Sequence, residues 1–175
     1  MTRAIALTLP LALVLTGCAT VDEAPSARLG QATLRLANGL PAGTAQLLSS
    51  GAQVNIAVAL TGLSQGVHGT HLHMVGSCDA PDFTSAGAHL NPGNRQHGLE
   101  NPAGTHLGDL PNATIGGSGA GTVSATLPGT REDVLARVFD SDGTAILVHA
   151  GADDHKTDPS GNSGGRIACG VFSPG

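Results

Sequence analysis

Histidines are the residues of this chain whose types and spacing most clearly point to chemistry. His71 and His73 are separated by one residue. Side chains alternate between the two faces of a β-strand, so on a strand both rings lie on the same face. They then start roughly 6–7 Å apart along the strand. Both rings could therefore reach one metal ion, and the pair predicts part of a metal site.

Further ligand candidates lie downstream of this pair: His89, His97, His106, Asp109 and His149. Together the candidates are six imidazoles and one carboxylate, which suit zinc or copper better than calcium or magnesium. One four-coordinate site would leave three donors idle, and two such sites need one donor more than is present. A shared imidazole that used both nitrogens would close the gap, although the count alone does not prove sharing.

Two other histidines are expected to lie outside the site. His68 precedes His71 by three positions, so on a continuous strand it faces the opposite side, and we expect a hydrogen-bonded structural role. His155 lies in a polar loop beside Asp154 and Lys156, which favours a solvated side chain.

Short runs of alternating apolar residues predict the strands that must position these groups. They cover residues 31–36, 43–48, 52–61, 66–75, 112–115, 122–127, 134–139, 145–149 and 166–172. No helical segment of normal length is expected. Eight or nine short strands indicate an all-β domain, either a β-sandwich or a flattened barrel.

Two long polar stretches interrupt the strands, at 76–110 and 151–165. A stretch of this length without apolar periodicity is usually either functional or disordered. Because the first stretch holds three of the histidines and Asp109, we interpret it as an ordered loop held by metal.

The composition limits the class of partner. Charged residues make up 12% of the chain, Trp and Tyr are absent, and the formal net charge is −5. The core must therefore consist of Val, Leu, Ile and Ala. The few Lys and Arg residues are scattered, which argues against nucleic acid as a partner.

The N-terminus is typical of an exported protein. Residues 1–17 carry one charge, Arg3, before an apolar run that is too short to span a bilayer, which predicts a signal peptide. Residues 15–18 (LTGC) resemble the lipobox of bacterial lipoproteins, in which the cysteine, here Cys18, is lipidated. An ordinary cleavage near Ala19 is the alternative. Residues 18–28 then form a flexible tether to a domain at 29–175.

The other two cysteines are Cys78 and Cys169. In an oxidising compartment an even remainder suggests a disulfide, and two free buried thiols are the alternative.

Several motifs resemble the copper,zinc superoxide dismutase family. Residues 66–73 (GVHGTHLH) resemble its G-x-H-G-x-H-x-H strand, and residues 85–92 (SAGAHLNP) its S-A-G-x-H-x-N-P loop. Residues 97–98 (HG) and 106–110 (HLGDL) resemble its zinc loop. Residues 148–154 (VHAGADD) and 164–170 (GGRIACG) resemble its V-H-x-x-x-D-D and G-x-R-x-A-C-G segments.

The resemblance implies an eight-stranded Greek-key β-barrel that binds copper and zinc. It implies copper ligands His71, His73, His89 and His149. It implies zinc ligands His89, His97, His106 and Asp109, with His89 as the bridging imidazolate. Asp153 would hydrogen-bond one histidine from each set, and the Cys78–Cys169 pair would help to position Arg166.

The activity implied by the resemblance is dismutation of superoxide to O₂ and H₂O₂ through a Cu(II)/Cu(I) cycle, with zinc shaping the site. Arg166 would guide the anion and His89 would carry a proton. Lys156 is a further candidate for guiding the substrate. The alternative is an exported copper- or zinc-binding protein without turnover. We expect contact with a bacterial membrane only through a lipid on Cys18, with the domain facing the periplasm. Monomer and homodimer both stay open.

Overall fold

The computed structural model describes residues 27–175. The predicted signal peptide, Cys18 and most of the predicted tether lie outside the described residues. Arg28 is expected to end the tether, but in the structure it belongs to the sheet and pairs with Leu48. Within the described part of the chain, no helix is long and apolar enough to cross a membrane.

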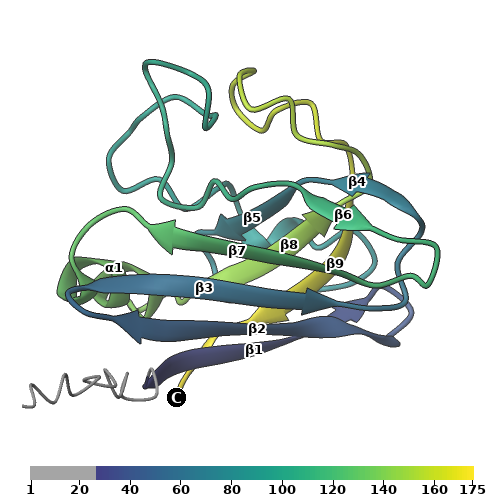
Figure 1. Cartoon of the computed structure of the whole chain (residues 1–175), viewed down its shortest axis with the longest axis horizontal. Helices are drawn as coiled ribbons and strands as arrows, with labels where there is room; N and C mark the ends of the chain where they lie inside the picture. Colours follow the sequence, from purple (N-terminus) through teal and green to yellow (C-terminus); the bar gives the residue numbers. More distant parts are fainter. Residues whose placement is uncertain (1–26) are drawn as a thin grey trace, which may run out of the picture.

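A curled antiparallel sheet of eight strands forms the domain, as Figure 1 shows. Its strands are β1 (Arg28–Leu36), β2 (Pro41–Ser50), β3 (Gln53–Leu60), β5 (Thr70–His73), β7 (Gly121–Leu127), β8 (Ala145–His149), β9 (Arg166–Val171) and β10 (Ser173–Pro174). They run in the order β5-β8-β9-β1-β2-β3-β7, and β10 pairs with β1. A separate two-stranded sheet pairs β4 (Gly66–His68) with β6 (Ala113–Ile115). The predicted all-β class is confirmed.

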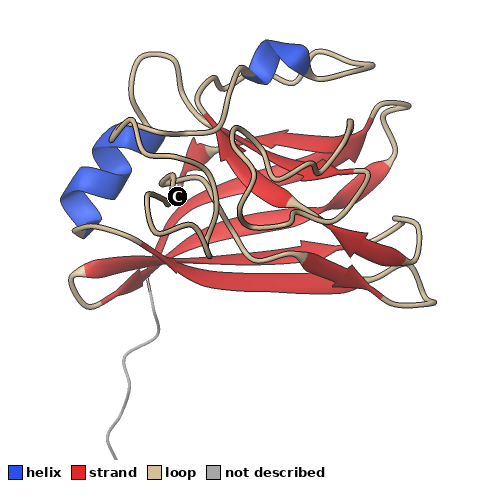
Figure 2. Cartoon of the chain, turned by 90° about the horizontal axis from the view of Figure 1, so that it is seen from above, coloured by secondary structure: helices blue, strands red, loops and turns tan. Residues whose placement is uncertain are grey.

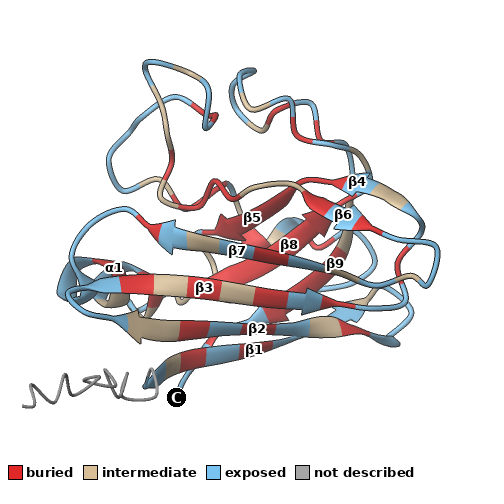
Figure 3. Ribbon diagram, in the orientation of Figure 1, coloured by how far each residue is buried: buried red, intermediate tan, exposed pale blue. Residues whose placement is uncertain are grey.

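Alternating apolar residues decide which face of each strand is buried. In β3, Val54, Ile56, Val58 and Leu60 are buried and the residues between them are more exposed. Figure 3 shows this alternation along β1, β2 and β3, whereas β5 and β8 are buried along their whole length. The strand β5, which carries His71 and His73, and its partner strand β8 thus lie in the interior.

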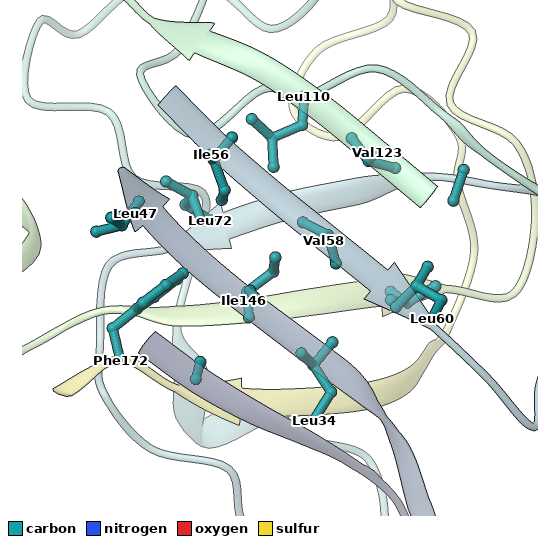
Figure 4. Close-up of a cluster of buried hydrophobic side chains, with 14 of the residues drawn as sticks. Leu34, Leu47, Ile56, Val58, Leu60, Leu72, Leu110, Val123, Ile146 and Phe172 are labelled. Atoms are coloured by element: carbon teal, nitrogen blue, oxygen red, sulfur yellow. The ribbon is translucent and has the colours of Figure 1, made fainter. Parts of the chain in front are cut away.

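The core fills the space inside the curled sheet with aliphatic side chains. Leu34, Leu47 and Ile56 from one side meet Leu72 and Ile146 from the other, as Figure 4 shows. All five side chains are fully buried. This packing positions β5 and β8 beneath the loop that supplies His89, His97 and His106.

The strand expected at 134–139 is wrong, because this segment forms the helix α1 (Arg131–Val138). Thr130 caps the helix by accepting a hydrogen bond from the Asp133 backbone N–H, and Val134 and Val138 are buried. The sequence signal was a Thr followed three residues later by an acidic residue. Figure 2 shows α1 and the short 3₁₀ helix η1 (Thr84–Ala86) at the periphery of the strands.

The single strand expected at 66–75 is divided at Gly69. The Gly69 N–H donates to the Gly151 carbonyl at 2.8 Å, and the Gly69 carbonyl accepts from the His149 N–H at 2.8 Å. The chain therefore leaves β4, which pairs with β6, and enters β5, which pairs with β8.

Two long loops, teal and yellow in Figure 1, extend from the same side of the sheet. They are hydrogen-bonded to each other. The His97 N–H donates to Asp158 Oδ1 at 2.6 Å, and the Glu100 N–H donates to the His155 carbonyl at 3.0 Å. The expectation of an ordered first loop agrees with these contacts.

Candidate metal centre

The histidine pair of β5 occupies a buried strand. His71 lies opposite Leu147 and His73 opposite Ala145 in β8, and both rings are almost completely buried. Their ring centroids are 6.4 Å apart, which agrees with the predicted spacing along one strand. The pair therefore points two imidazoles at the same region beneath the loops.

Four imidazoles converge at this pair. His89 arrives from the first long loop, where it forms a β-bridge with His73, and His149 ends β8. One nitrogen from each of His71, His73, His89 and His149 lies within 4.8 Å of the others, and all four side chains are buried.

In each of these rings one nitrogen is fixed by a protein group. His73 Nδ1 donates to the Gly87 carbonyl at 2.9 Å, and His149 Nδ1 donates to the Gly164 carbonyl at 3.0 Å. His71 Nε2 donates to Asp153 Oδ2 at 2.7 Å. His89 Nδ1 lies 3.1 Å from Asp109 Oδ1. The hydrogen bonds thus fix the direction in which the second nitrogen of each ring points.

These second nitrogens have no hydrogen-bond partner among residues 27–175: His71 Nδ1, His73 Nε2, His89 Nε2 and His149 Nε2. A buried polar atom without a partner costs free energy, so four that face one another call for an explanation. A metal ion between them would satisfy all four. Four neutral imidazoles suit copper or zinc.

Burial also keeps these rings in the form that binds metal. Desolvation lowers the pKa of His71 to about 3, that of His73 to about 2 and that of His149 to about 4. A neutral imidazole can ligate a metal without first losing a proton. The first group of four therefore fits a metal ion in charge as well as in geometry.

A second group of four candidate ligands lies beside the first and is organised around Asp109. Its members are His89, His97, His106 and Asp109. Asp109 Oδ1 lies 3.1 Å from His89 Nδ1, 2.9 Å from His97 Nδ1 and 3.1 Å from His106 Nδ1. Three imidazoles and one carboxylate form a typical zinc ligand set.

The other carboxylate oxygen of Asp109 holds the loop in place. Oδ2 accepts hydrogen bonds from the Gly98 N–H, the His106 N–H and the Thr105 hydroxyl. Burial alone would raise the pKa of Asp109, but the hydrogen bonds that it accepts outweigh burial and lower this pKa. The ligand is thus held ionised.

His89 belongs to both groups. It contributes Nε2 to the first and Nδ1 to the second. This is the shared imidazole for which the donor count left room.

Asp153 connects the two groups from the outside. Its Oδ2 accepts from His71 Nε2 at 2.7 Å, and its Oδ1 accepts from His97 Nε2 at 3.0 Å. Burial would raise the pKa of Asp153, whereas its hydrogen bonds with His71 and His97 lower it overall. One carboxylate thus orients a ring from each group.

Arg166 lies at the opening above the first group. A cavity of about 290 Å³ is lined by Arg166 together with His73, His89, Ala88, His149, Pro159, Ser160 and Gly164. The guanidinium donates to the Phe83 carbonyl and to the Gly87 carbonyl, each at 2.6 Å. Cys169, on the same strand β9, forms a disulfide with Cys78. The predicted disulfide is confirmed. It joins β9 to the loop whose Phe83 and Gly87 carbonyls accept hydrogen bonds from Arg166.

Three further polar residues were considered from the sequence: His68, His155 and Lys156. His68 lies outside both groups, as expected, and its ring contacts the His149 and Ser64 carbonyls at 2.8 and 3.1 Å. His155 is not simply solvated, because its Nδ1 lies 3.5 Å from Asp153 Oδ2. Lys156 forms an exposed ion pair with Glu100 at 2.9 Å.

Asn112 is a residue that sequence reasoning missed. Its amide forms two hydrogen bonds with the backbone of Asp153, 41 residues away. Asn112 lies two positions after Leu110, the last residue of the zinc-loop motif. This proximity was the only feature of the sequence that could have indicated a role at the site.

Sequence comparisons with known proteins all point to one family. A family model described as copper/zinc superoxide dismutase matches residues 41–172. A "Superoxide dismutase [Cu-Zn]" of Caulobacter vibrioides is 40% identical over 149 residues, which cover 81% of this chain and 83% of that protein. The "Superoxide dismutase-like protein YojM" of Bacillus subtilis is 46% identical over 106 residues, 59% of this chain. That match spans only about half of YojM, 54% of its length.

The fold comparison agrees with the sequence comparisons. The crystal structure of a SOD-like protein from Bacillus subtilis superposes with a TM-score of 0.76 at 38% identity. The superposition covers 83% of this chain and 99% of that one. Together with the two ligand groups, these findings show that the chain belongs to the copper/zinc superoxide dismutase family.

Proposed function

We propose that this protein dismutates superoxide with one copper and one zinc ion. In the reaction two superoxide anions and two protons yield one O₂ and one H₂O₂. The observation that carries the proposal is the set of four buried, unpartnered imidazole nitrogens below the opening that Arg166 lines. Membership of the family supports the same activity.

The two ligand groups differ in a way that suggests which metal each would take. We assign copper to the four-imidazole group of His71, His73, His89 and His149, because this group faces the cavity. We assign zinc to His89, His97, His106 and Asp109, which lie beneath the first loop. Copper, when bound, supplies the one-electron couple, and zinc has no redox chemistry of its own.

The residues of the chain would bind and orient the substrate. Superoxide is an anion and the chain carries a net charge of −5, so a local positive group is needed at the opening. Arg166 supplies that charge, and its two carbonyl contacts hold the guanidinium in position. His89 lines the same cavity, and we place on this residue the proton that is passed to the product.

A metal-binding protein without turnover is the competing function. Such a protein needs neither an anion-guiding arginine nor an opening above four imidazoles. This chain has both, and both ligand groups are complete. These features favour the enzyme.

Metal analysis combined with a dismutase assay tests the proposal. We expect purified protein that has been loaded with both metals to hold about one copper and one zinc per chain and to dismutate superoxide. Full loading without activity would establish the binding protein instead. A His149→Ala variant serves as the control, since it should keep zinc but lose copper and activity.

We also propose that the protein is an exported lipoprotein whose domain faces the periplasm. The support is in the sequence alone, in the apolar segment 4–15 followed by Cys18 in a lipobox-like context. Metabolic labelling with a fatty acid, compared between the natural chain and Cys18→Ala, tests the anchor. Equal labelling of both chains would contradict it.

A further inference from the structure

Asn112 uses its side-chain amide to hold the backbone of Asp153 from both directions. Asn112 Oδ1 accepts from the Asp153 N–H at 2.8 Å, and Asn112 Nδ2 donates to the Asp153 carbonyl at 2.8 Å. A single amide thus pairs with one residue much as a neighbouring strand would. Since the pairing joins the end of the first loop to the second, it fixes Asp153 relative to the zinc loop.

His155 contacts the same amide and the same aspartate. Its Nε2 lies 3.0 Å from Asn112 Nδ2. With the amide oriented by the Asp153 backbone, the ring nitrogen accepts the second amide N–H. The His155 backbone N–H also donates to Asp153 Oδ1 at 2.7 Å. A reversed Asn112 amide would set its Nδ2 against the Asp153 N–H and its Oδ1 against the Asp153 carbonyl, so only one orientation fits.

The Asp153 carboxylate is itself fixed by hydrogen bonds. Asp153 is buried, and its two oxygens already accept from His71 and His97. A shift of the Asp153 backbone would therefore move both hydrogen bonds. Because each of these rings contributes its other nitrogen to a ligand group, the shift would reach both proposed metals.

We propose that Asn112 is a positioning residue for the metal centre, acting through Asp153 on His71 and His97. This inference rests on the proposed function, in which those two histidines are metal ligands. Groups that orient metal ligands typically change metal affinity by about 10–100-fold when they are removed. Asn112 acts one contact further out, so the lower end of that range is expected.

Replacement of Asn112 by Asp is the sharpest test, because the side chain keeps its shape. The new carboxylate loses the donor to the Asp153 carbonyl and sets an oxygen against it. The matched control is Asn55→Asp in β3, a half-buried amide that accepts from the Thr126 hydroxyl on the other side of the domain. Asn112→Ala serves as a second variant that removes the contacts without adding charge.

Two readouts separate positioning from general stability. We expect zinc affinity, measured by competition with a chelator, to fall by about tenfold in Asn112→Asp and to stay unchanged in Asn55→Asp. In the NMR spectrum of the zinc-loaded protein, the ring Nε2–H protons of His71 and His97 should exchange faster with water in both Asn112 variants.

The proposal is overturned if both Asn112 variants fold and bind zinc within twofold of Asn55→Asp, or if the two ring protons keep their slow exchange. Should Asn112→Asp not fold, Asn112→Ala decides between these outcomes. Inactivity of the natural protein toward superoxide would overturn the proposed function, yet it would leave both of these readouts intact. The two failures are therefore distinguishable.

Discussion

Arg166 and His73 donate hydrogen bonds to the same acceptor, the carbonyl oxygen of Gly87. The guanidinium does so at 2.6 Å and His73 Nδ1 at 2.9 Å. The group that we assign to guiding the anion and a ring that we assign to copper are thus fixed to one peptide unit. This shared contact sets the position of the charge relative to the metal site.

Replacement of Arg166 by Ala should slow the reaction with superoxide by about tenfold, because the local positive charge is lost. The rate should also become less sensitive to ionic strength, and copper and zinc contents should stay near those of the natural protein. Pulse radiolysis at several salt concentrations measures both effects. Arg131→Ala is the control, since it removes the same charge and one hydrogen bond, to Ser49 Oγ. Equal rates for both variants would contradict a guiding role.

Removal of the disulfide should lower the free energy of unfolding by about 2–5 kcal/mol. Cys78 and Cys169 are 91 positions apart, so the bond restricts a large loop in the unfolded chain. Urea denaturation of a Cys78→Ser/Cys169→Ser variant measures the loss. A reductant should bring the natural protein to the same stability and leave the variant unchanged. If the reductant weakens both equally, the effect does not come from this bond.

Replacement of Gly161 by Ala should weaken zinc and copper binding together. A Cβ at this position would collide with the Asp153 carboxylate, and the backbone has a φ of +63° that favours glycine. Gly39→Ala is the matched control, because Gly39 has a φ of +82° but nothing within 4 Å of the added atom. Metal affinities from chelator competition should fall by at least tenfold only for Gly161→Ala. Similar affinities in both variants would show that Asp153 tolerates displacement.

The metal-free protein should be most stable near pH 7, roughly where the folded and unfolded chains bind equal numbers of protons. Burial holds the pKa of His71 at about 3 and that of His73 at about 2. Below pH 6.5 the unfolded chain therefore binds protons that these folded rings do not, and stability falls as the pH decreases. The loss is on the order of 1 kcal/mol per ring and pH unit.

Above about pH 7 the sign reverses because of His97. Burial alone would lower its pKa, but hydrogen bonds with Asp109 and Asp153 raise it to about 9. The folded state then holds a proton that the unfolded chain releases, and stability falls as the pH rises toward 9. Urea denaturation from pH 5 to pH 9 measures both limbs. A stability that increases steadily across this range would contradict the assigned directions.

Most strands could be predicted because their apolar pattern is local. The alternation in β3 and the apolar run of β8 are readable from neighbours in the chain. The helix α1 was missed because its short sequence also fits a strand, and only the Thr130 cap distinguished the two. The division at Gly69 was missed because it depends on hydrogen bonds to Gly151 and His149, far along the chain.

The sequence by itself determined the donor types, their number and the pairing of His71 with His73, since these follow from residue identity and a two-residue period. Only the tertiary structure decided which nitrogen of each ring is left without a hydrogen-bond partner and so available to a metal. That choice depends on what the other nitrogen contacts: the Gly87 carbonyl for His73 and Asp153 for His71. The Asp153 backbone N–H in turn donates to Asn112 Oδ1. These partners meet only through folding, so no local pattern in the sequence could have revealed them.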